Sequence, residues 1–257
     1  MNHYTTTKKI VITDLATADK TVKVSHVSSY PCSESCFPIV ALSNGSKTTT
    51  SNTHQKGDNN MSFCMATYRN NGFIIGADTR INYSDSTHYD NYRKIYSFDT
   101  IKAGIFCHNL GTFFIKGEKY TFTDLMGDFE TDNDCSALTL EEMNSKVAFL
   151  IGAGAVSTGI PVYFTICGFE KTGKLSVPVL YRTSIENGII NTIKIIAREC
   201  WSYYGGEYES VRLAETRELL PTEDHLQFVS RQVNQAILED KTGSIGGDID
   251  TIVVNLD

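Results

Sequence analysis

A hydroxyl, a carboxylate and an amine follow one another at even spacing in the first half of this chain. Ser62 is followed after 16 residues by Asp78 and after another 16 by Lys94. A serine hydroxyl is a weak nucleophile until a neighbouring base takes its proton. Ser–Lys pairs and N-terminal residues whose own α-amine is the base are two known ways of taking it. The segment holds the groups for both, so acyl transfer through Ser62 is the chemistry to consider.

These three residues stand at the ends of strand-like stretches. Ser62 opens one stretch, Asp78 closes the next, and Lys94 opens a third. The turn Arg-Asn-Asn-Gly at residues 69–72 predicts a hairpin between the first two, because Asn and Gly tolerate positive φ. Short connections favour an antiparallel meander, whose matched strand ends meet at one edge of a sheet. We therefore expect the three side chains to lie together at such an edge.

Further periodicity predicts more strands and a first helix. Residues 102–107 continue the meander, and residues 162–169 and 174–179 form a second hairpin. A capping box at Thr139 opens a helix that is expected to end near Ile151, before two glycines.

The C-terminal part adds a second helix and a last strand. Residues 222–240 place apolar side chains on one face at helical spacing, and this face needs a sheet to cover it. A glycine-led turn then enters a buried-type strand that ends at Val254. Strands, helices and further strands together predict an α+β fold in which two sheets face each other and helices cover the outer sides.

The chain divides into two parts by composition. Residues 1–60 contain 18 Ser or Thr, and residues 43–60 are almost entirely polar. Such a composition cannot bury enough apolar surface to offset the entropy of ordering, so this part is expected to be an N-terminal extension. Within it, short alternating patterns such as residues 22–27 suit an edge strand. The folded domain is expected at residues 61–257.

Composition also narrows the possible partners. The net charge of -7 and the pI near 5.4 argue against nucleic acid, whose binding proteins normally carry a basic face. No apolar run is long enough to cross a bilayer, so no membrane partner is expected. The first residues lack the layout of a secretory signal, and we therefore expect a cytoplasmic protein.

The cysteines point to packing and not to a metal. Cys64, Cys107 and Cys167 lie in apolar, strand-like runs and are expected to be buried thiols. Cys32 and Cys36 have no second Cys or His pair at ligand spacing. No glycine-rich phosphate loop is present either, so neither a metal nor another cofactor is expected.

The spacing of these residues resembles that of the proteasome-like N-terminal-nucleophile (Ntn) hydrolases. The matching segments are Ser62, Gly72-Phe-Ile-Ile-Gly-Ala-Asp78-Thr-Arg80 and Tyr92-Arg-Lys94-Ile-Tyr96. The bacterial ancestral β-subunit group, Anbu, is the most similar, because its members begin in the manner of Met61-Ser-Phe-Cys64 and share the step Cys107-His-Asn-Leu110. The resemblance is dense from 61 to 111 and absent from the first 60 residues.

The resemblance implies a four-layer αββα sandwich and a threonine/serine-type peptidase. Ser62, as the first residue of the mature chain, would attack a peptide carbonyl while its α-amine relays the proton. Asp78 would orient Lys94, an electrostatic and proton-shuttling partner, and Arg80 would brace Asp78. Family members stack into rings or helical oligomers, so a homo-oligomer that cleaves peptides or unfolded proteins is expected, with an unfoldase partner conceivable but unnamed.

Other family positions are altered here. The resemblance places His108 where the family has an oxyanion-hole glycine; a backbone N–H survives any side chain, but the glycine's freedom of φ is lost. Gly205 and Gly206 match a supporting turn that lacks its serine. Ser244 falls in the segment 242–247, where the family's carboxylate is missing or shifted to Asp240. The resemblance also implies that the substrate pocket involves residues such as Ile81, His88 and Phe106.

The N-terminus of the mature protein has three interpretations. Met61 is the true initiator and is removed, the chain cleaves itself between Met61 and Ser62, or residues 1–60 persist and keep the protein inactive or dock it to a partner. Two alternative functions are considered besides the peptidase. One is a structural subunit that has lost turnover, and the other is an amidase acting on a non-peptide amide.

Overall fold

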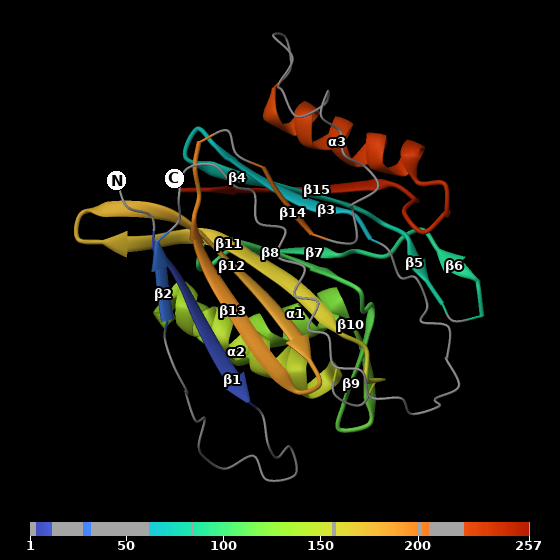
Figure 1. Ribbon diagram of the computed structural model, residues 1–257, viewed down its shortest axis with the longest axis horizontal. Coiled ribbons are helices and arrows are strands. Elements are labelled where there is room, and N and C mark those ends of the chain that lie inside the picture. Colours follow the sequence, from blue (N-terminus) through green and yellow to red (C-terminus); the bar gives the residue numbers. More distant parts are fainter. Residues whose placement is uncertain are drawn as a thin grey trace.

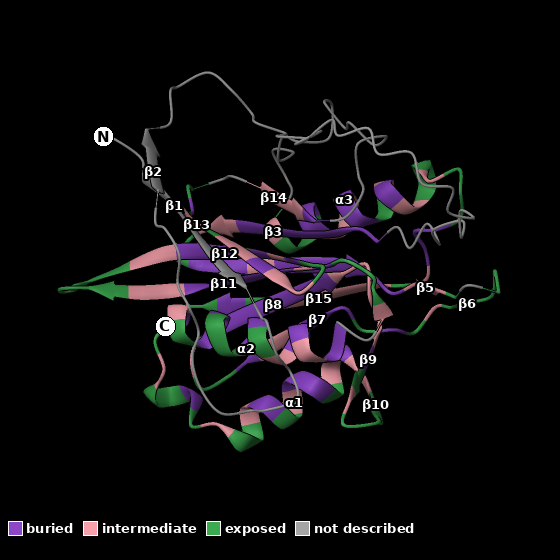
Figure 2. Ribbon diagram, turned by 60° about the horizontal axis from the view of Figure 1, so that its bottom comes forward, coloured by how far each residue is buried: buried purple, intermediate pink, exposed green. Residues whose placement is uncertain are grey.

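The computed structural model describes residues 4–11, 28–31, 62–83, 85–155, 158–199, 202–205 and 224–256. Their backbone forms two larger antiparallel sheets that lie face to face, with helices on the outer side of each (Figures 1 and 2). The predicted α+β fold is confirmed.

The smaller of these sheets begins directly after Ser62. Its strand order is β14-β3-β4-β15, and each neighbouring pair is antiparallel. β3 and β4 form the predicted hairpin, in which Asn70 and Asn71 adopt φ values of 49° and 61°, as a two-residue hairpin turn requires. The strands are β3 (Cys64–Arg69), β4 (Gly72–Asp78), β14 (Ser202–Gly205) and β15 (Ile249–Asn255).

The larger sheet has the order β2-β1-β13-β12-β11-β8-β7. It contains the second predicted hairpin, β11 (Val162–Thr172) and β12 (Leu175–Glu186), beside β8 (Ala103–His108) and β7 (Ile95–Phe98). β13 (Ile189–Ile196) was not predicted. The expectation of one continuous meander is wrong, because β3 and β4 lie in one sheet and β7 and β8 in the other. Alternating apolar residues show that a strand is half buried, but they do not say which sheet it joins.

Two small hairpins complete the strands. β5 (Ile81–Asn82) pairs with β6 (His88–Tyr89) where the chain crosses from the smaller sheet to the larger, and β9 (Thr112–Ile115) pairs with β10 (Glu118–Thr121). Figure 1 shows the first of these hairpins projecting at one end of the sandwich.

Each contact between layers has its own apolar core. α1 (Phe122–Asp132) and α2 (Leu140–Ala155) cover the larger sheet, and α3 (His225–Glu239) covers the smaller one (Figure 2). Representative core residues are Phe122, Met143 and Ile166 under α1 and α2, Ile75, Phe106 and Leu180 between the sheets, and Phe63, Val229 and Val233 under α3. Three cores between four layers correspond to the expected αββα sandwich.

The first predicted helix is longer than expected. α2 begins at the predicted capping box, where Glu142 N donates to Thr139 Oγ1 and Thr139 N donates to Glu142 Oε2. It then continues past Ile151 to Ala155. A Cβ at Gly154 would lie 3.0 Å from the Cβ of Phe113. This glycine therefore permits close packing on β9, and the prediction that it ends the helix is wrong.

The described parts of the N-terminal 60 residues are two strands. β1 (Tyr4–Val11) pairs with β13, and β2 (Ser28–Pro31) pairs with β1. The edge strand expected within residues 22–27 lies outside the described residues. The division of the chain at residue 61 stays a prediction. Among the described helices, none combines the length and the apolar character that a membrane span needs.

Candidate active site

The centre of the site is a buried ion pair that joins the two sheets. Asp78 is the last residue of β4, in the smaller sheet, and Lys94 directly precedes β7, in the larger one. Lys94 Nζ lies 2.7 Å from Asp78 Oδ1, and the side chains are 4% and 0% exposed. The predicted proximity of these residues therefore holds, although they meet across the sandwich and not along one sheet edge.

Backbone amides complete the coordination of the Asp78 carboxylate. Oδ1 also accepts from Phe63 N at 2.8 Å, and Oδ2 accepts from Gly246 N at 3.1 Å and from Arg80 N at 3.3 Å. A buried carboxylate is tolerated only when its lone pairs are satisfied and its charge is balanced. The Asp78 carboxylate thus holds three backbone segments together: the residue after Ser62, the residues that lead into β5, and the loop before β15.

Ser62 lies beside this ion pair. It is 8% exposed, and the amide of the next residue, Phe63, is held by Asp78. Ser62 and Lys94 line one small pocket. The structure therefore brings the three predicted catalytic side chains into one site. The other residues that line the pocket are Ile81, Asn82, Tyr92, Cys107, His108, Asn109, Leu110, Gly111 and Phe122.

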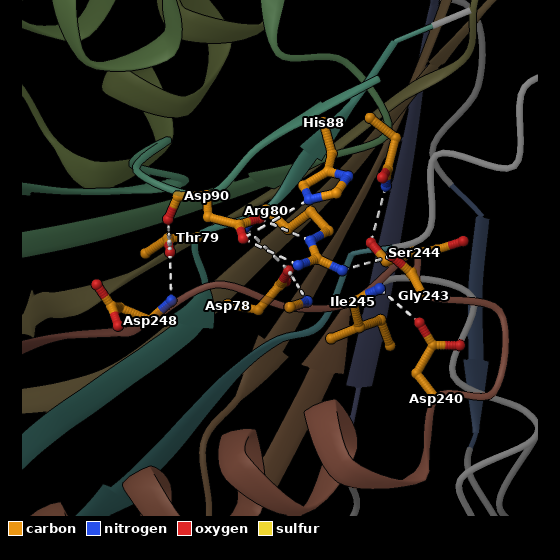
Figure 3. Close-up of polar contacts among 12 residues, drawn as sticks. Asp78, Thr79, Arg80, His88, Asp90, Asp240, Gly243, Ser244, Ile245 and Asp248 are labelled. Carbon is orange, nitrogen blue, oxygen red and sulfur yellow. Dashed lines mark hydrogen bonds and ion pairs between the residues drawn. The ribbon is translucent and has the colours of Figure 1, made fainter. Parts of the chain in front are cut away.

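Arg80 braces the site differently from the prediction. Its backbone N–H donates to Asp78, but its guanidinium pairs with Asp90, through Nε to Oδ1 at 2.6 Å and Nη2 to Oδ2 at 2.9 Å (Figure 3). Nη1 also donates to the carbonyl of Gly243 at 2.9 Å. The hydrogen bond from Arg80 is the main cause that holds the pKa of Asp90 below its usual range. Arg80 thus ties the segment after β4 to the loop before β15.

That loop is organised by Asp240. Its Oδ1 accepts from Thr242 Oγ1 at 2.6 Å. Its Oδ2 accepts from Ile245 N at 2.6 Å (Figure 3). Thr242 Oγ1 also lies 2.8 Å from Ser244 Oγ. Burial alone would raise the pKa of Asp240, but these hydrogen bonds lower it below the ordinary value. The carboxylate thus positions the loop that contains Ser244, the residue whose carbonyl accepts from Asn82 Nδ2 at 2.8 Å.

His108 lines the pocket as a neutral ring. Burial lowers its pKa to about 3, and the charges of Arg182 and Lys94 act in the same direction. A group with so low a pKa is a poor general base near neutral pH. The next residue, Asn109, adopts φ of 78°. The left-handed residue of this turn is therefore Asn109, one residue after His108, which the resemblance aligns with the family's glycine. Gly205 packs against the His108 ring, whereas Gly206 lies outside the described residues.

The predicted substrate-pocket residues separate in the structure. Ile81 lines the pocket, whereas Phe106 is fully buried in the core between the sheets. His88 is half exposed and lies 3.9 Å from Asp90. Sequence reasoning missed Asn82 and Tyr92, whose hydroxyl accepts from Phe122 N at 2.7 Å. The one feature of the sequence that pointed to Tyr92 as a pocket residue is its position two residues before Lys94 in the matched motif.

The cysteines near the site are not competing nucleophiles. Cys64, Cys107, Cys135 and Cys167 are free and buried, as expected for the three that the sequence singled out. Burial raises the pKa of the Cys64 thiol to about 12, so it stays protonated near neutral pH. Among the described residues, no group of three or more His, Cys, Asp or Glu could hold a metal ion.

Solved structures with a similar fold exist, at low sequence identity. The chain is similar to Anbu (ancestral beta-subunit) from Yersinia bercovieri, with 14% identity and a TM-score of 0.48 over 75% of this chain and 81% of that one. A Gly-1 mutant of Anbu from Hyphomicrobium sp. strain MC1 has 14% identity and a TM-score of 0.49, over 76% of this chain and 81% of that one. HslV from Trypanosoma brucei has 11% identity and a TM-score of 0.43, over 75% of this chain and 99% of that one. No protein-family model and no curated protein matches the chain.

The chemical capacity of the site follows from its own residues. A hydroxyl shares a small pocket with an ammonium group, and a fully buried carboxylate holds that ammonium group in place. Such an arrangement stabilises developing negative charge near the hydroxyl, because a fixed positive charge acts more strongly where water is excluded.

Proposed function

We propose that this protein is an Ntn hydrolase that cleaves peptide bonds with Ser62 as its nucleophile. The observation that carries the proposal is the buried pair of Asp78 and Lys94 at the pocket that Ser62 lines. A buried ion pair is costly to maintain and adds little stability compared with apolar packing. Its position beside a hydroxyl favours a catalytic purpose. The spacing of Ser62, Asp78 and Lys94 in the sequence supports the same proposal.

The first half of the proposed reaction forms an ester. Ser62 Oγ attacks the carbonyl carbon of the scissile bond, and its proton passes to the α-amine of the same residue. An α-amine has a pKa near 8, which suits a general base close to neutral pH. The ammonium group of Lys94 stabilises the negative charge of the tetrahedral intermediate. The C–N bond then breaks, and the α-ammonium returns the proton to the leaving amine.

The second half is hydrolysis of that ester. A water molecule gives a proton to the α-amine and attacks the ester carbonyl, and the C–O bond to Ser62 breaks as Oγ takes the proton back. The acid product leaves and the enzyme returns to its first state. Asp78 keeps Lys94 at one position through both halves, since the carboxylate is itself fixed by three backbone N–H groups.

The proposal requires that Ser62 carries a free amine. If the preceding residues stay attached, the nitrogen of Ser62 is an amide and cannot act as a base. We favour removal of Met61 as an initiator, with self-cleavage before Ser62 as the other route. The intact mass of the natively expressed protein distinguishes a chain that begins at Ser62 from one that keeps residues 1–60.

The proposed assembly is a homo-oligomer, a ring or a helical stack, which encloses peptide or unfolded-protein substrates. Heterologous contacts close into rings or continue as helices according to their rotation. Four free cysteines among the described residues suit a reducing compartment such as the cytoplasm. Native mass spectrometry and electron microscopy of the purified protein test the assembly.

A second candidate is a structural subunit without turnover. It is favoured by the low exposure of Ser62, 8%, and by the histidine that fills part of the pocket. Hydrolysis of fluorogenic peptides separates the two candidates. We expect release of the fluorophore by wild type with a verified free Ser62, and none by Ser62→Ala. Silence of the verified wild type would favour the structural subunit, and a panel of acylated amines tests the non-peptide amidase.

A further inference from the structure

The ring of His108 is held in one orientation from two sides. His108 ends β8 and pairs with Tyr163 of β11. The two rings stack with centroids 5.3 Å apart and planes 11° from parallel. On another side lies Gly205, where an added Cβ would be 2.9 Å from both Cδ2 and Nε2 of His108. The imidazole thus lies against a tyrosine ring and a bare backbone, which together restrict its rotation.

This orientation determines where the second ring nitrogen lies. In an imidazole, Nδ1 is the vertex opposite the Cδ2–Nε2 bond, so it points away from Gly205. Among the residues that the structure describes, His108 Nδ1 is buried and has no hydrogen-bond partner. Leaving a buried polar atom unsatisfied destabilises the folded state. The residue lines the pocket that Ser62 and Lys94 also line. A buried polar atom that stays unpaired on a residue lining a pocket is a candidate for pairing with a ligand that enters the pocket.

The charge state of the ring also suits ligand binding. Burial lowers the pKa of His108 to about 3, with Arg182 of β12 and Lys94 contributing in the same direction. The ring is therefore neutral near pH 7 and carries one N–H donor and one acceptor nitrogen. A neutral ring adds no second positive charge beside Lys94, and it forms hydrogen bonds without taking the proton of Ser62.

We propose that His108 is a substrate-binding residue whose Nδ1 hydrogen-bonds to the peptide backbone of the substrate and holds the scissile carbonyl before Ser62. Each peptide unit offers both an N–H donor and a C=O acceptor. Either tautomer of a neutral histidine therefore finds a partner in such a substrate. The identity of this ligand rests on the proposed peptidase function.

The kinetic test compares three substitutions in protein whose Ser62 amine is verified to be free. His108→Leu removes the hydrogen bond, and we expect the KM for a fluorogenic peptide to rise about 10-fold, because the partner atom on the substrate then stays unpaired. His108→Asn places an amide near the position of Nδ1 and should recover most of this loss. His225→Leu, on α3, is the control for a lost histidine elsewhere. Equal defects in His108→Leu and His108→Asn, or a fall in kcat without a change in KM, would overturn the proposal.

Nitrogen NMR of the ring tests the same contact without turnover. In Ser62→Ala protein with ¹⁵N-labelled histidine, the signal that disappears in His108→Asn is assigned to His108. We expect this ring to stay neutral at pH 5 and its Nδ1 signal to shift when an uncleaved peptide is added. An unchanged Nδ1 signal under saturating peptide contradicts the inference. A shift in a protein whose wild type cleaves no peptide would instead contradict the peptidase function and leave the inference standing.

Discussion

Asp78 ends a strand of one sheet and Lys94 directly precedes a strand of the facing sheet, and their charged groups meet 2.7 Å apart in the interior. Among the described residues, Asp78 is the hydrogen-bond partner of the Lys94 ammonium group, whereas the Asp78 carboxylate accepts three further backbone N–H groups. The two ends of this ion pair are therefore unequally supported.

That inequality predicts unequal costs of substitution. Asp78→Asn leaves a buried ammonium group without its counter-ion, and we expect a loss of about 3–5 kcal/mol in the free energy of unfolding. Lys94→Met leaves a carboxylate that keeps three donors, so the loss should be smaller. Urea unfolding of both variants and of the double variant measures this. A larger loss for Lys94→Met than for Asp78→Asn would contradict the account.

The two-point contact between the Arg80 guanidinium and the Asp90 carboxylate should matter for activity through its geometry and not only through its charge. Arg80→Lys keeps the charge but cannot make the two-point contact with Asp90 and the bond to Gly243 together. We expect kcat/KM to fall about 10-fold, because the loop that donates Gly246 N to Asp78 loses its anchor. Arg93→Lys, in the exposed pair with Asp250, is the matched control and should change little. Equal effects of the two substitutions would count against the bracing role.

Gly205 should be intolerant of even one added carbon. Its Cβ would lie 2.7 Å from Phe106 Cε2 and 2.9 Å from the His108 ring, distances that force a shift. We expect Gly205→Ala to lower stability by about 1–3 kcal/mol, as overpacking does, and to displace His108. Gly127→Ala, in α1 with its nearest neighbour 3.9 Å away, should instead be neutral or stabilising. Thermal unfolding of both variants provides the comparison.

His108 should make the protein sensitive to mild acid. Its folded pKa, about 3, lies below the unfolded value of 6.5, so the unfolded chain takes up a proton that the folded chain resists. Stability therefore falls as pH drops from about 6.5 towards 3, and this contribution is about 2 kcal/mol at pH 5. We expect the free energy of unfolding of His108→Leu to fall less steeply over this range. Parallel curves for the two proteins would refute the assignment.

The sequence predicted the individual elements better than their assembly. The Asn-Asn turn, the capping box at Thr139 and the periodicity of residues 222–240 each act locally, and each corresponds to an element of the structure. The assignment of strands to two sheets depends on contacts between distant residues, which alternation does not encode. For the same reason, Gly154 was interpreted as a helix end when its function is to let α2 approach β9.

In the site, spacing identified the charged pair but not what surrounds it. Ser62, Asp78 and Lys94 were found because three reactive groups stood at strand ends. The partner of the Arg80 guanidinium was missed, because Asp90 lies in a short crossing with no periodic signal. The neutrality of His108 follows from burial against Tyr163 and Gly205, a feature of tertiary packing that no local pattern shows.

The most direct test of the account is mass spectrometry of the natively expressed protein after treatment with a peptide epoxyketone, a reagent that closes a ring with the hydroxyl and the amine of one residue. The account predicts a chain that begins at Ser62 and carries one reagent molecule on that residue, with no adduct on Ser62→Ala. An assembled, peptide-cleaving protein that keeps residues 1–60, or a chain with a free Ser62 that forms no adduct, would contradict it.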